Sequence, residues 1–207
     1  MTTQLEQLRH TTTDMGEALA RLGHKTNQFC SKNNVICKPG CGACCERPGD
    51  VWATVGEMLP MAWDVFERGD YDLVMERISR DDTDAMCVMF KPTTGHKGFG
   101  RCGEYPNRPI TCILFGATTR NKDGESKLLA CRYLTEQHSK TDHAVVADNL
   151  DAESLTWQTK SRILDSRLRE EHPINKALKE ALKLIQWANY ASELINERIT
   201  MVGNTFI

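Results

Sequence analysis

The chain has 207 residues, of which 40% are hydrophobic and 26% charged, and its formal net charge is −2. These values are typical of a soluble globular protein with one domain, or one domain and a helical extension. The chain has no excess of positive charge with which to bind nucleic acid. It also has no apolar run of the roughly 20 residues that a membrane span needs. We therefore expect neither nucleic acid nor a membrane as a partner.

The N-terminal segment predicts a long helix. Between residues 4 and 30 apolar side chains recur at helical spacing, including those of Leu8, Met15, Leu19 and Leu22. Three successive threonines at 11–13 are poor helix formers and could interrupt it. The segment begins MTTQLEQLRH, without a secretory signal, and we therefore expect a cytoplasmic protein.

Two shorter helices are predicted after residue 50. Thr54 and Glu57 have the spacing of a capping box at the start of the first, and residues 71–78 form the second. The stretch 87–108 is rich in glycine and proline and does not favour regular structure. Residues 110–119 and 127–133 flank a turn and predict a β-hairpin that brings Cys112 near Cys131.

The last third of the chain is predicted to be helical, with one helix over 152–171 and another that starts at Pro173. This second helix could pack its apolar stripe on the cysteine-rich region, or it could dock a partner or a second copy of the chain. The stripe consists of Ile174, Leu178, Ala181, Ile185, Ala188, Ile195 and Ile199.

Nine cysteines are the most informative residues of the chain. Clustered thiols either form disulfides or bind metal, and the expected reducing compartment favours metal. An odd number would also leave one thiol over from any complete set of disulfides within the chain. Four fall within the sequence CKPGCGACC at Cys37, Cys41, Cys44 and Cys45, and the others are Cys30, Cys87, Cys102, Cys112 and Cys131.

All of these cysteines except Cys30 are candidate metal ligands. Eight thiols are too many for one mononuclear ion, so two zinc ions, two iron–sulfur clusters, one of each, or a single cluster with spare thiols are all open. In an extended segment or in a helix the neighbours Cys44 and Cys45 diverge, and we expect them to serve different centres.

The sequence resembles the YkgJ-like cysteine-cluster family, which is described as zinc- or iron-chelating. The resemblance covers roughly residues 37–131 and depends on CKPGCGACC, Glu57 at a helix start, Cys87, the segment 102–105 (CGEY) and the segment 108–112 (RPITC). Two departures from the family pattern are the three-residue gap between Cys37 and Cys41 and the Val-Met-Phe segment after Cys87. Neither removes a candidate ligand.

This resemblance implies metal chelation through a CxxCxxCC-type domain, and the family is often labelled iron–sulfur. We therefore expect an iron–sulfur cluster, with 4Fe–4S favoured, and zinc as the alternative. A related cysteine region occurs in lysine N-methylases that use S-adenosylmethionine, so a metal-dependent group-transfer enzyme is a further alternative. Its substrate pocket would be expected at residues 91–103.

Two residues are expected to lie around the ligands. Pro109 biases Arg108 toward an extended conformation, from which its guanidinium could offset the negative charge of thiolates. Tyr105 could hydrogen-bond a group beside the metal, or it could simply pack as a loop aromatic.

The predicted fold class is α+β, mostly helical, with a metal-organised cysteine-rich core, a small β-hairpin and flanking N- and C-terminal helices. We divide the chain into an N-terminal helical segment (1–34), a cysteine-cluster metal-binding domain (35–135) and a C-terminal helical extension (150–203) packed on it. A zinc-stapled module that binds an unknown protein partner through its C-terminal helix is the alternative to an iron–sulfur protein.

Overall fold

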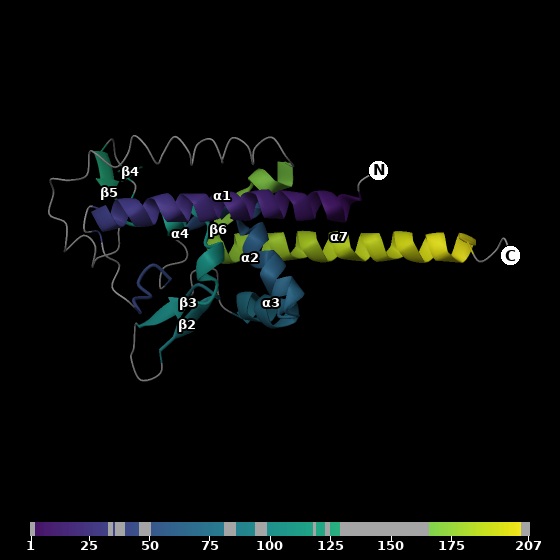
Figure 1. Cartoon of the computed structure of the whole chain (residues 1–207). Coiled ribbons are helices and arrows are strands. Elements are labelled where there is room, and N and C mark those ends of the chain that lie inside the picture. The colour runs from purple at the N-terminus through teal and green to yellow at the C-terminus, as the bar shows by residue number, and fades with distance from the viewer. Residues whose placement is uncertain are drawn as a thin grey trace.

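The computed structural model describes residues 3–32, 35, 40–45, 51–80, 86–93, 99–117, 119–122, 125–128 and 166–203. These parts form a mostly helical α+β fold (Figure 1). In chain order the elements are α1 (Gln4–Lys32), β1 (Trp52–Thr54), α2 (Val55–Glu67), α3 (Tyr71–Arg80), β2 (Phe90–Pro92), β3 (Gly100–Cys102), the 3₁₀ helix η2 (Tyr105–Asn107), α4 (Ile110–Ile113), β4 (Thr119–Lys122), β5 (Glu125–Leu128), the 3₁₀ helix η3 (Ser166–Arg169), β6 (Glu171–Pro173) and α7 (Ile174–Gly203).

Helix α1 runs without interruption through its three threonines. Each hydroxyl donates a hydrogen bond to the carbonyl four residues earlier, at 3.0, 2.8 and 3.1 Å, so these side chains are satisfied within the helix. Its apolar stripe is buried at Leu8, Met15, Leu19 and Leu22, as predicted. The expected break at residues 11–13 was therefore wrong.

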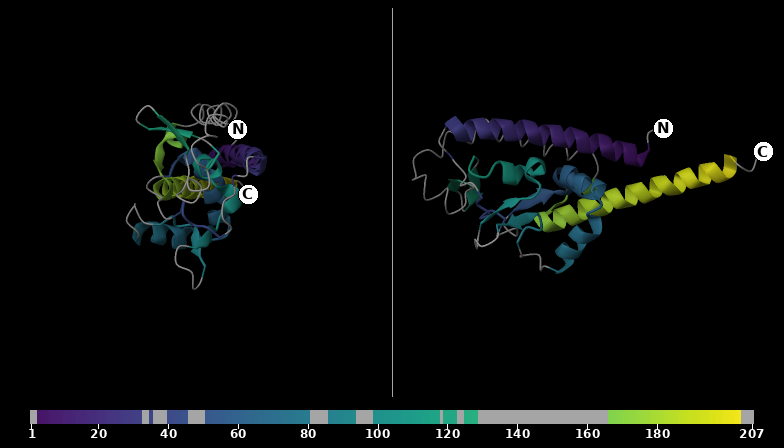
Figure 2. Two further views of the ribbon diagram at one scale, coloured as in Figure 1. Left: turned by 90° about the vertical axis from the view of Figure 1, so that its left-hand side faces the viewer. Right: turned by 60° about the horizontal axis from the view of Figure 1, so that its bottom comes forward.

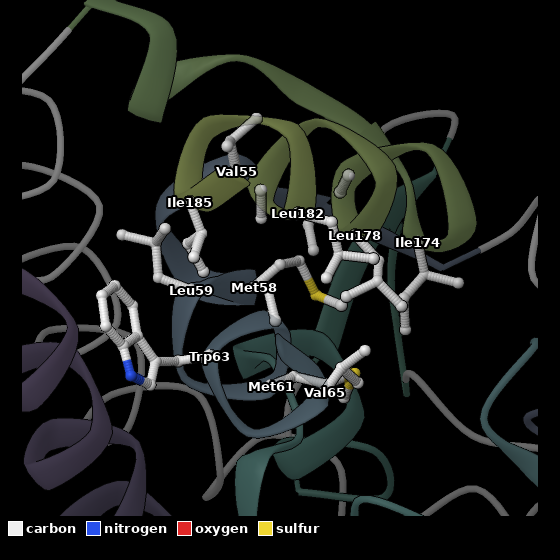
Figure 3. Packing of buried hydrophobic residues seen from close by; sticks show 14 of the residues in the cluster. Val55, Met58, Leu59, Met61, Trp63, Val65, Ile174, Leu178, Leu182 and Ile185 are labelled. Atoms are coloured by element: carbon white, nitrogen blue, oxygen red, sulfur yellow. The ribbon is translucent and has the colours of Figure 1, made fainter. Parts of the chain in front are cut away.

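Helix α2 packs against both α1 and α7 (Figures 1 and 2). The predicted capping box is present, with Thr54 as the N-cap and Glu57 three residues later. Almost every residue of α2 is buried, because different faces of this helix pack against different neighbours. The side chain of Met58 in α2 points between Leu178 and Leu182 of α7, as Figure 3 shows.

The first half of α7 buries the predicted stripe, and its second half does not. Ile174, Leu178, Ala181, Ile185 and Ala188 are at most 5% exposed. Beyond them α7 extends past α2 and past the N-terminal end of α1 (Figures 1 and 2), and Ile195 is 53% exposed. The side chain of residue 199 lies outside the described part.

Strand β6 precedes α7 and pairs antiparallel with β1, with Ala53 opposite His172. The predicted helix over 152–171 was thus wrong at its C-terminal end, where η3 and then β6 are found. Pro173 disfavours the helical conformation for the residue before it, which explains the extended segment. Residues 152–165 of this prediction lie outside the described part of the chain.

The glycine- and proline-rich stretch contains regular structure after all. Strands β2 and β3 pair antiparallel, with Phe90 opposite Cys102 and Pro92 opposite Gly100. A Cβ atom at Gly100 would come within 2.4 Å of the Phe90 ring, so glycine allows the strands to approach closely around this ring.

A hairpin is present but lies later in the chain than predicted, with β4 and β5 paired from Thr119 opposite Leu128 to Lys122 opposite Glu125. Residues 110–113 form the helix α4 instead of a strand. Ile110 and Ile113 lie three residues apart and bury one face of this turn in a cluster with α1 residues, which overrides their β-propensity. The expected approach of Cys112 to Cys131 lies outside the described residues.

Among the described residues, no helix is long and apolar enough to cross a lipid bilayer.

Candidate metal centre

The cysteine loop is fixed at its described end by backbone hydrogen bonds to β3. Gly40 has a φ of 72°, which favours glycine, and its carbonyl accepts from the Gly100 N–H at 2.8 Å. Cys41 forms an isolated antiparallel bridge with Phe99. The Cys45 N–H donates to the Gly42 carbonyl at 2.8 Å, which closes a turn over residues 42–45.

This turn brings the sulfurs of Cys44 and Cys45 together. Their Sγ atoms are 4.0 Å apart, so the expected divergence of the two side chains was wrong. The physical reason is that residues 43–45 form a turn, which is neither extended nor helical. Their assignment to different metal centres remains a prediction.

Cys87 joins this pair from a distant part of the sequence. Its N–H donates to the Cys45 carbonyl at 2.8 Å, and the two thiols also contact each other. The loop of Cys87 is held in turn by Asn175 at the start of α7, which accepts from the Val88 N–H at 3.1 Å and donates to the Met86 carbonyl at 3.3 Å.

Cys102 on β3 and Cys112 on α4 complete the group. The pKa of Cys112 is raised well above its usual value by burial and by the negative charge that Cys44 and Cys45 would carry as thiolates. The charge of a Cys102 thiolate would also raise the pKa of Cys112, so these sulfurs lie close enough to interact electrostatically. We call Cys44, Cys45, Cys87, Cys102 and Cys112 the thiol group.

Close packing makes Cys44, Cys45, Cys102 and Cys112 poor acids unless a cation is present. The contact with Cys45 and burial raise the pKa of Cys44. For Cys45 the contact with Cys44 lowers the pKa, but the contact with Cys87, burial and neighbouring thiolate charge raise it to about 12 overall. Burial likewise raises the pKa of Cys102.

A metal ion reverses this preference, because it binds thiolates and compensates their charge. The chemistry of the thiol group therefore fits a thiophilic metal. Within the described part of the chain, however, no three or more Cys, His, Asp or Glu side chains are already arranged as ligands around one point. Two of the predicted ligands, Cys37 and Cys131, lie outside that part.

Cys41 and Cys30 are placed differently from the thiol group. Cys41 is half-buried on the same loop, and no contact of its sulfur with another thiol is found among the described residues. Cys30 lies on α1 and packs against the cluster of Ile110 and Ile113. Its exclusion from the predicted ligands remains a prediction.

Arg108 provides positive charge beside the thiols. Its guanidinium lowers the pKa of Cys44, Cys102 and Cys112, although burial outweighs this effect. Its Nη1 donates to the Cys112 carbonyl at 3.4 Å, and its Cζ lies 3.6 Å from the centre of the Tyr105 ring. Tyr105 is 57% exposed, and its ring makes a cation–π contact with the guanidinium.

Three polar residues near the thiols were not identified from the sequence as part of this region. Glu104 is 5% exposed, forms an ion pair with Arg68 at 2.7 Å, and its backbone N–H lowers the pKa of Cys102. Asn175 supports the Cys87 loop, and no local pattern marked it. Glu57 was identified as a cap and as one of the residues that carry the family resemblance, but its hydrogen bond with Ile110 was not predicted.

Comparison with known proteins identifies a family for this chain. A family model described as "CxxCxxCC: Putative zinc- or iron-chelating domain" matches residues 36–141, just over half of the chain. The matched region contains all eight predicted ligands. No curated protein and no solved structure matches the chain. The match and the grouped thiols together show that the chain belongs to the CxxCxxCC family of zinc- or iron-chelating domains.

Proposed function

We propose that this protein holds an iron–sulfur cluster through cysteine thiolates in a reducing cytoplasm. The observation that carries the proposal is the thiol group itself, in which five sulfurs from three separate stretches of sequence lie within interaction range. A tetrahedral zinc ion and a four-cysteine iron–sulfur cluster each take four thiolates, so the thiol group provides enough ligands for either; the frequent iron–sulfur label of the family that the sequence resembles favours the cluster. The 4Fe–4S type is the form we favour.

The residues around the thiols suit such a cluster. Arg108 offsets negative charge, and the N–H of Glu104 donates toward the Cys102 sulfur, which is the type of contact that tunes cluster potential. When bound, the cluster would supply one-electron transfer or structural reinforcement. The remaining candidate ligands are Cys37, Cys41 and Cys131.

Anaerobic purification followed by elemental analysis and a visible absorption spectrum tests the proposal. We expect a brown protein that contains iron and acid-labile sulfide. Colourless protein with stoichiometric zinc would contradict the iron–sulfur assignment and establish the zinc alternative. Protein with neither metal would contradict metal binding altogether.

A zinc-stapled interaction module is the second candidate, and the distal half of α7 favours it. Trp187, Tyr190 and Leu194 are 51%, 59% and 42% exposed, and they recur at spacings of three and four residues. This is the spacing with which one helix packs against another, so the candidate interface suits a second copy of α7.

Sedimentation velocity across a range of concentrations tests this candidate. A dimer that is lost in the variant Trp187→Ser/Leu194→Ser would support it. A chain that is monomeric at every concentration would contradict it. The group-transfer alternative has no comparable observation in its favour, and residues 94–98 of the loop proposed for its pocket lie outside the described part.

A further inference from the structure

Glu57 is a buried carboxylate that connects two helices. It is 4% exposed and lies in the first turn of α2. Its Oε1 accepts from the Thr54 hydroxyl at 3.1 Å and from the Thr54 N–H at 3.4 Å. Its Oε2 accepts from the Ile110 N–H at 3.1 Å, across 53 residues of sequence. A cap of α2 alone would not need the second oxygen.

Helix α4 has no N-terminal cap of its own. Its N-cap residue is Pro109, which provides no side-chain hydrogen bond. The Ile110 N–H is buried and has no acceptor within the helix, because the first amides of any helix lack one. An unpaired buried N–H is costly, so the carboxylate of Glu57 replaces the missing cap from another element.

The position of Cys112 depends on this short helix. Ile110 and Ile113 face the cluster with α1, whereas Cys112 packs against the core formed with α2 and α7. A rotation or shift of α4 would therefore move the Cys112 sulfur relative to Cys44 and Cys102. Besides Glu57, α4 is held by Thr111, whose hydroxyl donates to the Trp52 carbonyl at 2.8 Å, and by the contact of Arg108 with the Cys112 carbonyl.

We propose that Glu57 is a positioning residue of the metal centre, which fixes the Cys112 thiolate for metal binding by capping α4 from α2. This inference rests on the proposed function, since it requires that Cys112 binds metal. Residues that orient metal ligands typically change metal affinity by about 10–100-fold when they are removed. Removal of the Glu57 side chain should therefore lower metal affinity by more than the loss of overall stability alone would explain.

The experiment compares Glu57→Ala, Glu57→Gln and Val65→Ala in anaerobically purified protein. Val65 is the matched control, because it is fully buried on the same helix and its truncation weakens the core without removing the hydrogen bond to the Ile110 N–H. Two quantities are measured: the rate at which the protein loses its metal to a competing chelator, and hydrogen exchange in a peptide that covers residues 110–117.

Glu57→Ala is expected to lose metal about 10-fold faster than the wild type or more, with faster exchange at the start of α4. Glu57→Gln retains one oxygen for the Ile110 N–H, so it should recover most of the metal retention. Val65→Ala should retain metal like the wild type even if its unfolding midpoint falls as far as that of Glu57→Ala. Should Glu57→Ala fail to fold, Glu57→Asp replaces it in the comparison with Val65→Ala, because the shorter side chain keeps a carboxylate but withdraws it from the Ile110 N–H.

Wild-type retention and unchanged exchange in Glu57→Ala would overturn the inference, as would equal metal loss in Val65→Ala. Either result leaves the proposed function intact, because the wild type still binds metal. A wild type without zinc or iron overturns the proposed function and this inference together.

Discussion

Four sulfurs of the thiol group, those of Cys44, Cys45, Cys102 and Cys112, are weak acids, and this explains why the group would act as one unit. Burial and the thiolate charge of neighbouring cysteines both raise the pKa of these four thiols, although the contact with Cys44 lowers that of Cys45. Arg108 provides only part of the compensating charge. A metal ion that binds several of the thiols relieves this repulsion for all of them, so the loss of one ligand should weaken the entire centre.

Cys44→Ser and Cys112→Ser are each expected to lower metal content to less than half of the wild-type value and to lower thermal stability. Serine does not replace a thiolate ligand at a soft metal site. Metal is measured by elemental analysis of anaerobically purified protein, and stability by circular dichroism on heating.

Cys30→Ser is the control for these two variants, because Cys30 lies on α1 and packs in a different cluster. Its metal content should equal that of the wild type. A loss of metal in Cys30→Ser as large as in the other two variants would show that the division into eight ligands and one other cysteine is wrong.

Glu57 also makes the stability of the fold depend on pH. Burial raises its pKa from 4.5 to about 7, although the N–H of Ile110 and the contacts with Thr54 oppose this; Glu171 adds to the increase. Between pH 4.5 and 7 the folded state therefore holds a proton that the unfolded state has released. The contribution of Glu57 to the free energy of unfolding therefore falls as pH rises through that window, by at most about 1.4 kcal/mol per pH unit.

Glu57→Gln removes this titration. Urea unfolding of the wild type and the variant at intervals between pH 4.5 and 8 measures the difference in their free energies of unfolding. We expect the wild type to lose stability relative to the variant as pH rises, with little further change above pH 8. A constant difference over the entire range would show that Glu57 does not titrate in the folded protein.

At the level of elements, the sequence predicted those that local patterns specify. The stripe of α1, the capping box of α2 and the short α3 could be predicted because spacing and capping are properties of neighbouring residues. Helix α4 and the strands β2 and β3 could not, since they depend on contacts with distant parts of the chain. Ile110 is helical because its side chain packs in a cluster with residues of α1. Gly100 lies in a strand because the Phe90 ring occupies the space that a side chain at this position would need.

Gly42→Ala is expected to destabilise the cysteine loop. A Cβ atom at this position would lie 2.1 Å from Cε2 of Phe90, and the ring is buried with Gly100 on another side, so it has little room to move. Overpacking of this kind costs about 1–3 kcal/mol. Urea unfolding of the purified protein measures the loss.

The matched control is Gly23→Ala in α1. A Cβ atom at Gly23 would meet nothing within 4 Å, and alanine favours the helix by about 0.5–1 kcal/mol, so this variant should be slightly more stable than the wild type. Equal stability of Gly42→Ala and the wild type would mean that the loop and Phe90 are not packed as described.

On the scale of the molecule, the thiol group lies at the edge of the main apolar core. Cys87 belongs to that core, and Cys45, Cys102 and Cys112 pack against it. The sequence identified the candidate ligands because thiols are rare and clustered. It could not predict which sulfurs meet, since Cys87 reaches Cys45 only through a backbone hydrogen bond and through the support of Asn175 from α7.

The contacts between α2 and α7 are built from apolar side chains. Helices α2 and α7 bury Met58, Leu178, Leu182 and Ile185 against one another, and these contacts involve no cysteine ligand (Figure 3). Residues 40–45 and 99–108, in contrast, form turns, a short strand and a 3₁₀ helix and bury no large apolar side chain. Metal removal should therefore loosen one part of the molecule more than the other.

Chelation under reducing, anaerobic conditions tests this separation by hydrogen exchange. We expect exchange to become faster in residues 40–45 and 99–112, which the metal would hold together, whereas α2 and residues 174–188 of α7 keep their protection because their apolar contacts remain. Equal loss of protection in α2 and α7 would mean that the metal supports the whole fold. If protection in the cysteine-bearing segments did not change after the metal had been removed, the thiol group would not be held by metal, because its geometry would persist without one.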